Sequence, residues 1–235
     1  MAFGNCTAPL FADVLLPVSE STAEQIRRIH LNMRKVHTVK CGVNFTLIRN
    51  IAKTIKQKKY DLVFMKRVQS VKGIFDFIEI LEKVAVFKKD LKAIIIGGDG
   101  HDAEIVKQEI VNRNLDKHVE FAGYIFDQKY KFEKLAQGKL FILPSYEENW
   151  AIVVGEAMAA GVPVISYKLP ELTQIWKNHV TWIPLGNTDM VVKAILEQLE
   201  DDNRLELEIA NNLRFIRDFD WKKIALEELQ ILSRL

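Results

Sequence analysis

Three acidic residues surround an expected strand-to-helix turn in the stretch "PSYEENWAIVVGEAMAAGVPVIS", residues 144–166. Glu147 and Glu148 follow an apolar run that ends in Pro-Ser, and Glu156 lies within the next helical segment. A helix that directly follows a strand presents free N–H groups, here near residues 149–151, which favour an anion such as phosphate. Carboxylates at the same place accept hydrogen bonds from the hydroxyls of a polyol. The pattern therefore indicates a ligand that is both sugar and phosphate.

The elements that must position these residues alternate between strands and helices. Short runs rich in Val, Ile, Leu and Phe are apolar on both faces, as parallel strands covered on both sides are. They cover residues 12–19, 35–41, 60–68, 91–98, 118–125, 139–145, 162–167 and 180–185. Helical periodicity covers residues 21–33, 72–87, 102–115, 150–160, 189–201 and about 204 to the end. Residues 44–59 are predicted to form a linker or a boundary helix.

This alternation predicts an α/β fold with a Rossmann-like, doubly wound parallel sheet. Ligands of such sheets bind at the carboxyl ends of the strands. The Pro-Ser turn follows one expected strand and precedes one expected helix, so it lies at that edge. We therefore look for the site there.

The composition is that of a soluble globular chain with a sizeable core, because 49% of the 235 residues are hydrophobic and 27% are charged. The formal net charge of +2 indicates neither a nucleic-acid partner nor an acidic tail. Cys6 and Cys41, without a flanking Cys/His cluster, predict neither a zinc site nor a disulfide framework. The sequence lacks an apolar run of the roughly 18–20 residues that cross a bilayer, and a basic signal-peptide start. We expect a cytoplasmic protein.

The stretch 144–166 resembles the signature of the retaining GT-B glycosyltransferases of glycosyltransferase family 4. In that family a Pro-Ser precedes two glutamates separated by seven residues, followed by Ala-Met, a small residue, Gly, any residue and Pro-Val-Ile. Glu148 and Glu156 fill the two glutamate positions. The resemblance implies that Glu148 contacts the hydroxyls of a donor sugar and that Glu156 holds the ribose of its nucleotide.

A second resemblance concerns "LVFMKRVQSVKG", residues 62–73, which is similar to the family's strand and loop with a Gly-Arg and then a Lys-Gly. It implies that Arg67 and Lys72 bind the donor diphosphate. A guanidinium and an ammonium can neutralise a departing nucleoside diphosphate without a metal ion. We therefore expect no metal and no cofactor.

Two further turns and the "ENWA" segment complete the implied donor site. "IIIGGDG" resembles a glycine turn that approaches the donor, and "VEFAGYI" resembles the strand end that holds the base. Where the family usually has Glu-Gly-Phe-Gly, this chain has "ENWA", and Lys66 stands where the family often has glycine. The resemblance implies donor contacts at Gly98, Gly100, Gly123, Tyr124, Ile125, Asn149, Trp150 and Ala151.

The resemblance also divides the chain. Residues 1–46 resemble the end of an N-terminal acceptor domain and the interdomain crossover, and residues 47–235 resemble the nucleotide-sugar-binding domain with its closing C-terminal helices. A complete member has a whole acceptor domain ahead of this region. The chain is therefore predicted to keep only a remnant of that domain.

These resemblances imply a retaining, metal-independent glycosyltransferase, in which Arg67, Lys72 and Glu148 are catalytic and a UDP-sugar or GDP-sugar is the donor. The acceptor would be a sugar, a lipid-linked or a polysaccharide hydroxyl, and a lipid-linked acceptor would bring peripheral membrane contact. Two alternatives stay open: a nucleotide-sugar-binding module that works with an acceptor domain on a separate chain, and a structural subunit that binds no donor. The sequence leaves the base, the sugar and the acceptor open.

Overall fold

The computed structural model describes residues 12–29, 36–98 and 101–234. Within them, six strands form one parallel sheet in the order β3-β2-β1-β4-β5-β6. The strands are β1 (Tyr60–Met65), β2 (Ala93–Ile96), β3 (Val119–Gly123), β4 (Gly138–Leu143), β5 (Val164–Tyr167) and β6 (Thr181–Ile183). The strand order reverses between β1 and β4, which is the point where ligands bind in sheets of this kind.

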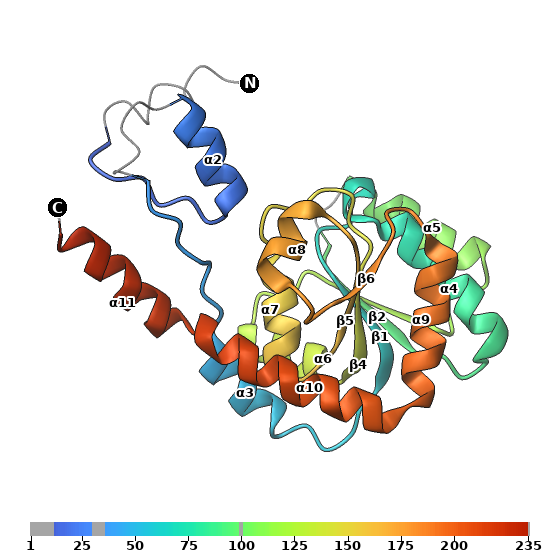
Figure 1. Cartoon of the computed structure of the whole chain (residues 1–235). Coiled ribbons are helices and arrows are strands. Elements are labelled where there is room, and N and C mark those ends of the chain that lie inside the picture. Colours follow the sequence, from blue (N-terminus) through green and yellow to red (C-terminus); the bar gives the residue numbers. More distant parts are fainter. Residues whose placement is uncertain (1–11, 30–35, 99–100, 235) are drawn as a thin grey trace.

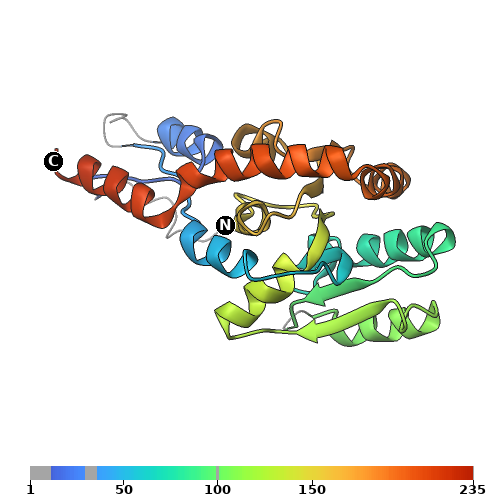
Figure 2. The same ribbon diagram turned by 90° about the horizontal axis from the view of Figure 1, so that it is seen from below.

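Two layers of helices cover the sheet, one on each face (Figures 1 and 2). One core cluster contains residues of α3 (Phe45–Ala52), α6 (Gln128–Ala136), α7 (Ile152–Ala159) and α8 (Pro170–Trp176). The other contains residues of α4 (Ile74–Phe87), α5 (Ala103–Asn112) and α9 (Thr188–Glu200). All residues of β1, β2 and β5 are buried, which explains why these runs are apolar on both faces. The doubly wound α/β fold is confirmed.

The remaining helices are α2 (Glu20–Ile29), α10 (Asp202–Ile216) and α11 (Trp221–Leu232), with 3-10 turns at Ser70–Lys72 and Arg217–Phe219. α10 packs against α7, whereas α2 and α11 project from the body formed by the sheet and its covering helices (Figure 1). None of the helices in the described ranges combines the length and the apolar character needed to cross a membrane.

Two of the predicted strands are wrong. In the described parts of residues 12–19 and 35–41, the only pairing is an isolated bridge between Leu15 and Val36. The backbone N–H of Val39 also donates to Pro17 O at 2.9 Å. An apolar pattern indicates burial but not a sheet partner, and a two-stranded pair alone is marginal. The predicted boundary helix is α3, whose Asn44 side chain caps its start.

Helices α6 and α8 were not expected from the sequence. α6 reads "QKYKFEKLA", which is polar except at Phe132, Leu135 and Ala136, and these buried residues pack on the core. Asp127 caps the start of α6 through a 2.6 Å hydrogen bond from the backbone N–H of Tyr130. α8 has only seven residues and starts at Pro170. Tertiary packing rather than local periodicity defines both helices.

Candidate functional site

Two turns meet where the strand order reverses. Gly73 ends the turn after β1 with φ +73°, and a Cβ there would lie 1.7 Å from the carbonyl oxygen of Pro144, which follows β4. Only glycine fits this conformation at this distance. The backbone N–H of Tyr146 donates to Val71 O at 3.0 Å. These contacts place Lys72 and the residues after Pro144 side by side.

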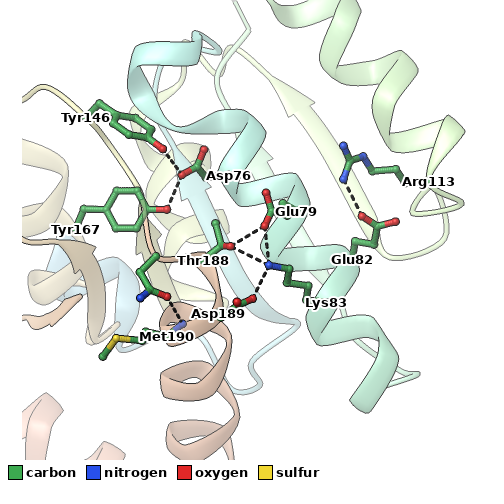
Figure 3. A network of polar contacts seen from close by, with 11 residues as sticks. Asp76, Glu79, Glu82, Lys83, Arg113, Tyr146, Tyr167, Thr188, Asp189 and Met190 are labelled. Atoms are coloured by element: carbon green, nitrogen blue, oxygen red, sulfur yellow. Dashed lines mark hydrogen bonds and ion pairs between the residues drawn. The ribbon is translucent and has the colours of Figure 1, made fainter. Parts of the chain in front are cut away.

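A polar network links the turn after β4 and the end of β5 to α4, and α4 to α9 (Figure 3). The hydroxyls of Tyr146 and Tyr167 both donate to Oδ2 of Asp76, in the first turn of α4. Burial and the neighbouring Asp76 raise the pKa of Tyr146 to about 12. The phenol therefore remains a donor, and the turn after β4 is held on α4.

Glu148 is the most closely surrounded carboxylate of the predicted site. Nζ of Lys66 lies 2.8 Å from its Oε1 and 2.9 Å from its Oε2, and Nζ of Lys72 lies 3.4 Å from Oε1. The Ser145 hydroxyl donates to Oε1 at 3.0 Å. The Glu148 side chain is only 6% exposed. Burial lowers the pKa of Lys66, Glu148 raises it, and Lys72 and Arg67 lower it.

The first of two adjoining cavities, here called the glycine cavity, has a volume of about 400 Å³. Glu156 and Lys131 form an ion pair there at 3.1 Å. Gly98 is needed at its wall because a Cβ would lie 2.8 Å from the backbone nitrogen of Tyr124. Its lining is Met65, Lys66, Arg67, Ile96, Gly97, Gly98, Tyr124, Ile125, Phe126, Gln128, Lys131, Val153 and Glu156.

The second cavity, here called the acidic cavity, has a volume of about 450 Å³. Its lining is Lys72, Tyr146, Glu147, Glu148, Asn149, Leu169 and Glu171. Lys66 lines the first cavity and Glu148 the second, so their ion pair stands at the partition between the two. The two cavities are therefore neighbours joined by one lysine–glutamate contact.

The two cavities have opposite charge. The described lining of the glycine cavity has three cationic side chains, Lys66, Arg67 and Lys131, against the single carboxylate of Glu156. The described lining of the acidic cavity has three carboxylates against Lys72. A positive cavity favours an anionic group, and carboxylates favour hydroxyl donors. A ligand with a phosphate at one end and hydroxyls at the other matches this arrangement.

The start of α7 borders the glycine cavity. Val153 and Glu156 line it, and no described side chain caps the helix. Ala151, the residue before α7, has φ +52°, a left-handed conformation that costs a non-glycine residue about 1–2 kcal/mol. Trp150 packs its ring against Trp176 at 4.6 Å between centroids, and its carbonyl accepts from Trp176 Nε1. The core thus fixes the backbone at the helix start.

The structure distributes the predicted residues over both cavities. Arg67, Gly98, Tyr124, Ile125 and Glu156 line the glycine cavity, whereas Lys72, Glu148 and Asn149 line the acidic cavity. Trp150 and Ala151 are buried beneath them, at 4% and 5% exposure. Gly123 ends β3 next to Tyr124 and is outside both linings as described. Gly100 lies outside the described residues.

Sequence reasoning missed Lys66, Lys131 and Ser145 as side chains of the site. Lys66 directly precedes Arg67, and these two adjacent basic residues were a usable signal. Lys131 comes from α6, the helix that was not expected, so its contact with Glu156 had no sequence signal. A larger hollow of about 850 Å³ lies between residues 178–181 and α10, but its lining contains none of the predicted site residues.

The structure is an α/β domain of the Rossmann-like type, with two adjoining cavities at the reversal of strand order. The chain belongs to the family described as glycosyl transferases group 1, whose model matches residues 48–214. That match covers all six described strands and the linings of both cavities. The expectation of a glycosyltransferase family is confirmed.

Two curated relatives illustrate the similarity. O-antigen chain mannosyltransferase B of Escherichia coli is 22% identical over 236 residues, which cover 95% of this chain and 61% of the relative. N-acetyl-alpha-D-glucosaminyl L-malate synthase of Bacillus anthracis is 24% identical over 200 residues, which cover 81% of this chain and 51% of the relative. This chain therefore spans half to three-fifths of the length of these relatives.

Two solved structures show the same fold. Sucrose-phosphate synthase from Thermosynechococcus elongatus aligns with a TM-score of 0.82 at 22% identity, over 98% of this chain and 60% of that one. HepE of Anabaena, in complex with UDP and glucose, aligns with a TM-score of 0.79 at 19% identity, over 97% of this chain and 65% of that one. The fold is that of GT-B glycosyltransferases.

Proposed function

We propose that this chain is the donor-binding half of a retaining GT-B glycosyltransferase of the family 4 type, which transfers a sugar from a nucleotide diphosphate sugar to an acceptor hydroxyl. The observation that carries the proposal is the pair of adjoining cavities with opposite charge at the reversal of strand order. Family membership supports it. So does the solved relative that holds UDP and glucose.

In this proposal the nucleotide and its phosphates occupy the glycine cavity and the sugar occupies the acidic cavity. Glu156 accepts hydrogen bonds from the ribose hydroxyls, and residues 123–125 border the base. Arg67 and Lys72 bind the diphosphate, which lies at the partition between the cavities. Glu148 faces the sugar, because its carboxylate lines the acidic cavity.

The chemical role of the cations follows from the charge that develops during transfer. The bond between the anomeric carbon and the diphosphate oxygen breaks, and the diphosphate takes the electron pair. A guanidinium and an ammonium fixed beside that oxygen stabilise the growing negative charge. We propose that these side chains make a metal ion unnecessary.

A second candidate is a donor-binding module that works with an acceptor domain on another chain. The observation that favours it is the "ENWA" segment, in which Asn149 and Ala151 stand where the family usually has glycine. Residues 1–46 would then be a remnant of the acceptor domain. Both candidates bind a nucleotide sugar, and they differ in turnover by the chain alone.

Calorimetry with the purified chain in the presence of EDTA tests the proposal. We expect saturable binding of UDP or GDP and of the corresponding nucleotide sugar. Arg67→Met should weaken it about tenfold to a hundredfold, the effect of losing a charge-assisted hydrogen bond. Lys193→Met is the matched control, because this exposed lysine lies on α9 in an ion pair with Glu197.

An assay of donor hydrolysis separates the two candidates. Slow release of the sugar by the chain alone, with the anomeric configuration retained in proton NMR, supports the enzyme. Binding without release supports the module. Absence of binding for every nucleotide tested would contradict both.

A further inference from the structure

Lys66 occupies a position that the donor residues implied by the resemblance do not explain. The family often has glycine there, which has no side chain. In this chain the Lys66 side chain is 16% exposed, lines the glycine cavity and reaches Glu148 with its ammonium. Burying a charge costs free energy unless partners offset it, so the burial of the Lys66 ammonium needs a physical explanation.

The hydrogen-bonding capacity of Glu148 is largely used. A carboxylate has about four lone-pair positions. Oε1 contacts Lys66, Lys72 and the Ser145 hydroxyl, and Oε2 contacts Lys66 again. One lone-pair position, on Oε2, therefore remains for a ligand hydroxyl. Glu148 can recognise a sugar only weakly while Lys66 remains in place.

The Lys66 ammonium also keeps capacity for a ligand, namely one N–H donor. It has three N–H donors, and its described contacts are with the two oxygens of Glu148. It also supplies part of the positive charge of the glycine cavity, whose described lining without Lys66 would hold two cations against one carboxylate. Burial lowers the pKa of Lys66, and an arriving anion would offset that cost.

We propose that Lys66 is a third ligand of the donor diphosphate, beside Arg67 and Lys72, and that Glu148 holds it at the partition between the two cavities. This inference rests on the proposed function. It implies that the chain recognises the diphosphate more than the sugar. UDP and UDP-glucose should therefore bind with affinities within about tenfold of each other.

The test is calorimetry with UDP on the whole chain. Lys66→Met should lower the affinity for UDP about tenfold to a hundredfold, as the loss of a charge-assisted hydrogen bond does. The same loss should appear with UDP-glucose, which locates the contact on the diphosphate. Lys66→Arg, which keeps the charge, should retain affinity within about threefold of the wild type.

A double variant separates a ligand contact from simple pairing with Glu148. Lys66→Met leaves the Glu148 carboxylate without its closest cation, and this alone could repel a diphosphate. Lys66→Met with Glu148→Gln removes that carboxylate. If Lys66 binds the diphosphate, the double variant still binds UDP at least tenfold more weakly than the wild type.

Two results would overturn the proposal. The first is UDP binding by the double variant within about twofold of the wild type, which would make Lys66 a counter-ion of Glu148 only. The second is a loss confined to UDP-glucose, which would place Lys66 on the sugar. Circular dichroism of each variant checks that the fold is intact. If the wild type bound no nucleotide, the proposed function itself would fail, which is a different outcome.

Discussion

Strand β1 has a lysine–glutamate cluster at each end, and the two clusters differ in kind. After its last residue, Lys66 pairs with Glu148 at 2.8 Å. At its first residue, Tyr60, the hydroxyl donates to Glu120, and Lys134 pairs with Glu120 at 2.6 Å. The Lys134 side chain is 11% exposed and that of Lys66 is 16% exposed, so burial of the lysine does not distinguish them.

The charges around each pair make the difference. At the Tyr60 cluster, burial raises the pKa of Glu120, but hydrogen bonds from Lys134, Tyr60 and Lys59 outweigh it and lower the pKa to about 2. The pKa of Lys134 is raised. At the other end, burial outweighs the effect of Glu148 and lowers the pKa of Lys66. The nearby cations Lys72 and Arg67 lower it further. We expect the first cluster to stabilise the fold, and we propose that the second holds cations in place for an anion.

The largest expected effect concerns the turn that builds the site. Gly73→Ala should lower the free energy of unfolding by about 3 kcal/mol or more, because a Cβ at φ +73° would lie 1.7 Å from Pro144 O. Gly123→Ala is the matched control, with φ +67° and no described atom within 4 Å of the added Cβ beyond its chain neighbours. It should cost about 1 kcal/mol. Equal losses in urea denaturation would contradict the close contact between the two turns.

The next effect tests the division of labour between the two ends of β1. Lys72→Met should weaken UDP binding about tenfold to a hundredfold. It should lower the free energy of unfolding by only about 1 kcal/mol, through the lost hydrogen bond from Nζ to Glu147 O at 2.6 Å. Lys134→Met should do the reverse: it leaves Glu120 partly unpaired and lowers the free energy of unfolding by about 2 kcal/mol. Calorimetry and urea denaturation of both variants measure the two quantities. Matching losses of affinity would contradict the comparison.

A smaller effect follows from the lowered pKa of Glu120. A carboxylate with a folded pKa of about 2, below its ordinary value of 4.5, stabilises the fold above about pH 4.5 and loses this contribution as pH falls toward 2. The side chain is 36% exposed, so screening by solvent reduces the contribution to about 1 kcal/mol. Glu120→Gln should therefore be destabilised at pH 7 by about that amount. The difference from the wild type should shrink in urea titrations at pH 5, 3.5 and 2.5, and a constant difference would refute the assignment.

The smallest effect concerns the start of α7. Ala151→Gly relieves the left-handed strain at φ +52°, but it gives the unfolded chain more freedom and removes a buried methyl group. These terms nearly cancel, so the melting temperature should change by at most about 2 °C, corresponding to about 0.5–1 kcal/mol. A loss above about 2 kcal/mol would show that the methyl group, rather than the backbone, defines the turn.

The sequence predicts the central strands of the sheet well because β1, β2 and β5 are buried on both faces, so each is a largely apolar run. The same signal misleads at residues 12–19 and 35–41, where apolar side chains accompany only the bridge between Leu15 and Val36. Helix α6 shows the opposite failure. Its polar sequence lacks a clear apolar periodicity, so the helix was not predicted. This helix supplies Lys131 to the site and Lys134 to the Tyr60 cluster.

The site is predicted in part for a related reason. Residues next to a strand end, such as Arg67, Lys72 and Glu148, follow from the resemblance and the chain order. Contacts between distant segments do not. The ion pair of Lys66 with Glu148 joins positions 82 residues apart, and only the fold brings them together.

A crystal structure of the chain with UDP-glucose tests the central claim most directly. The account predicts the diphosphate between Arg67, Lys66 and Lys72, the nucleoside in the glycine cavity beside Glu156, and the glucose in the acidic cavity. Density for the nucleotide in another hollow, such as the one between residues 178–181 and α10, would contradict the account. So would a nucleotide whose phosphates contact none of these three cations.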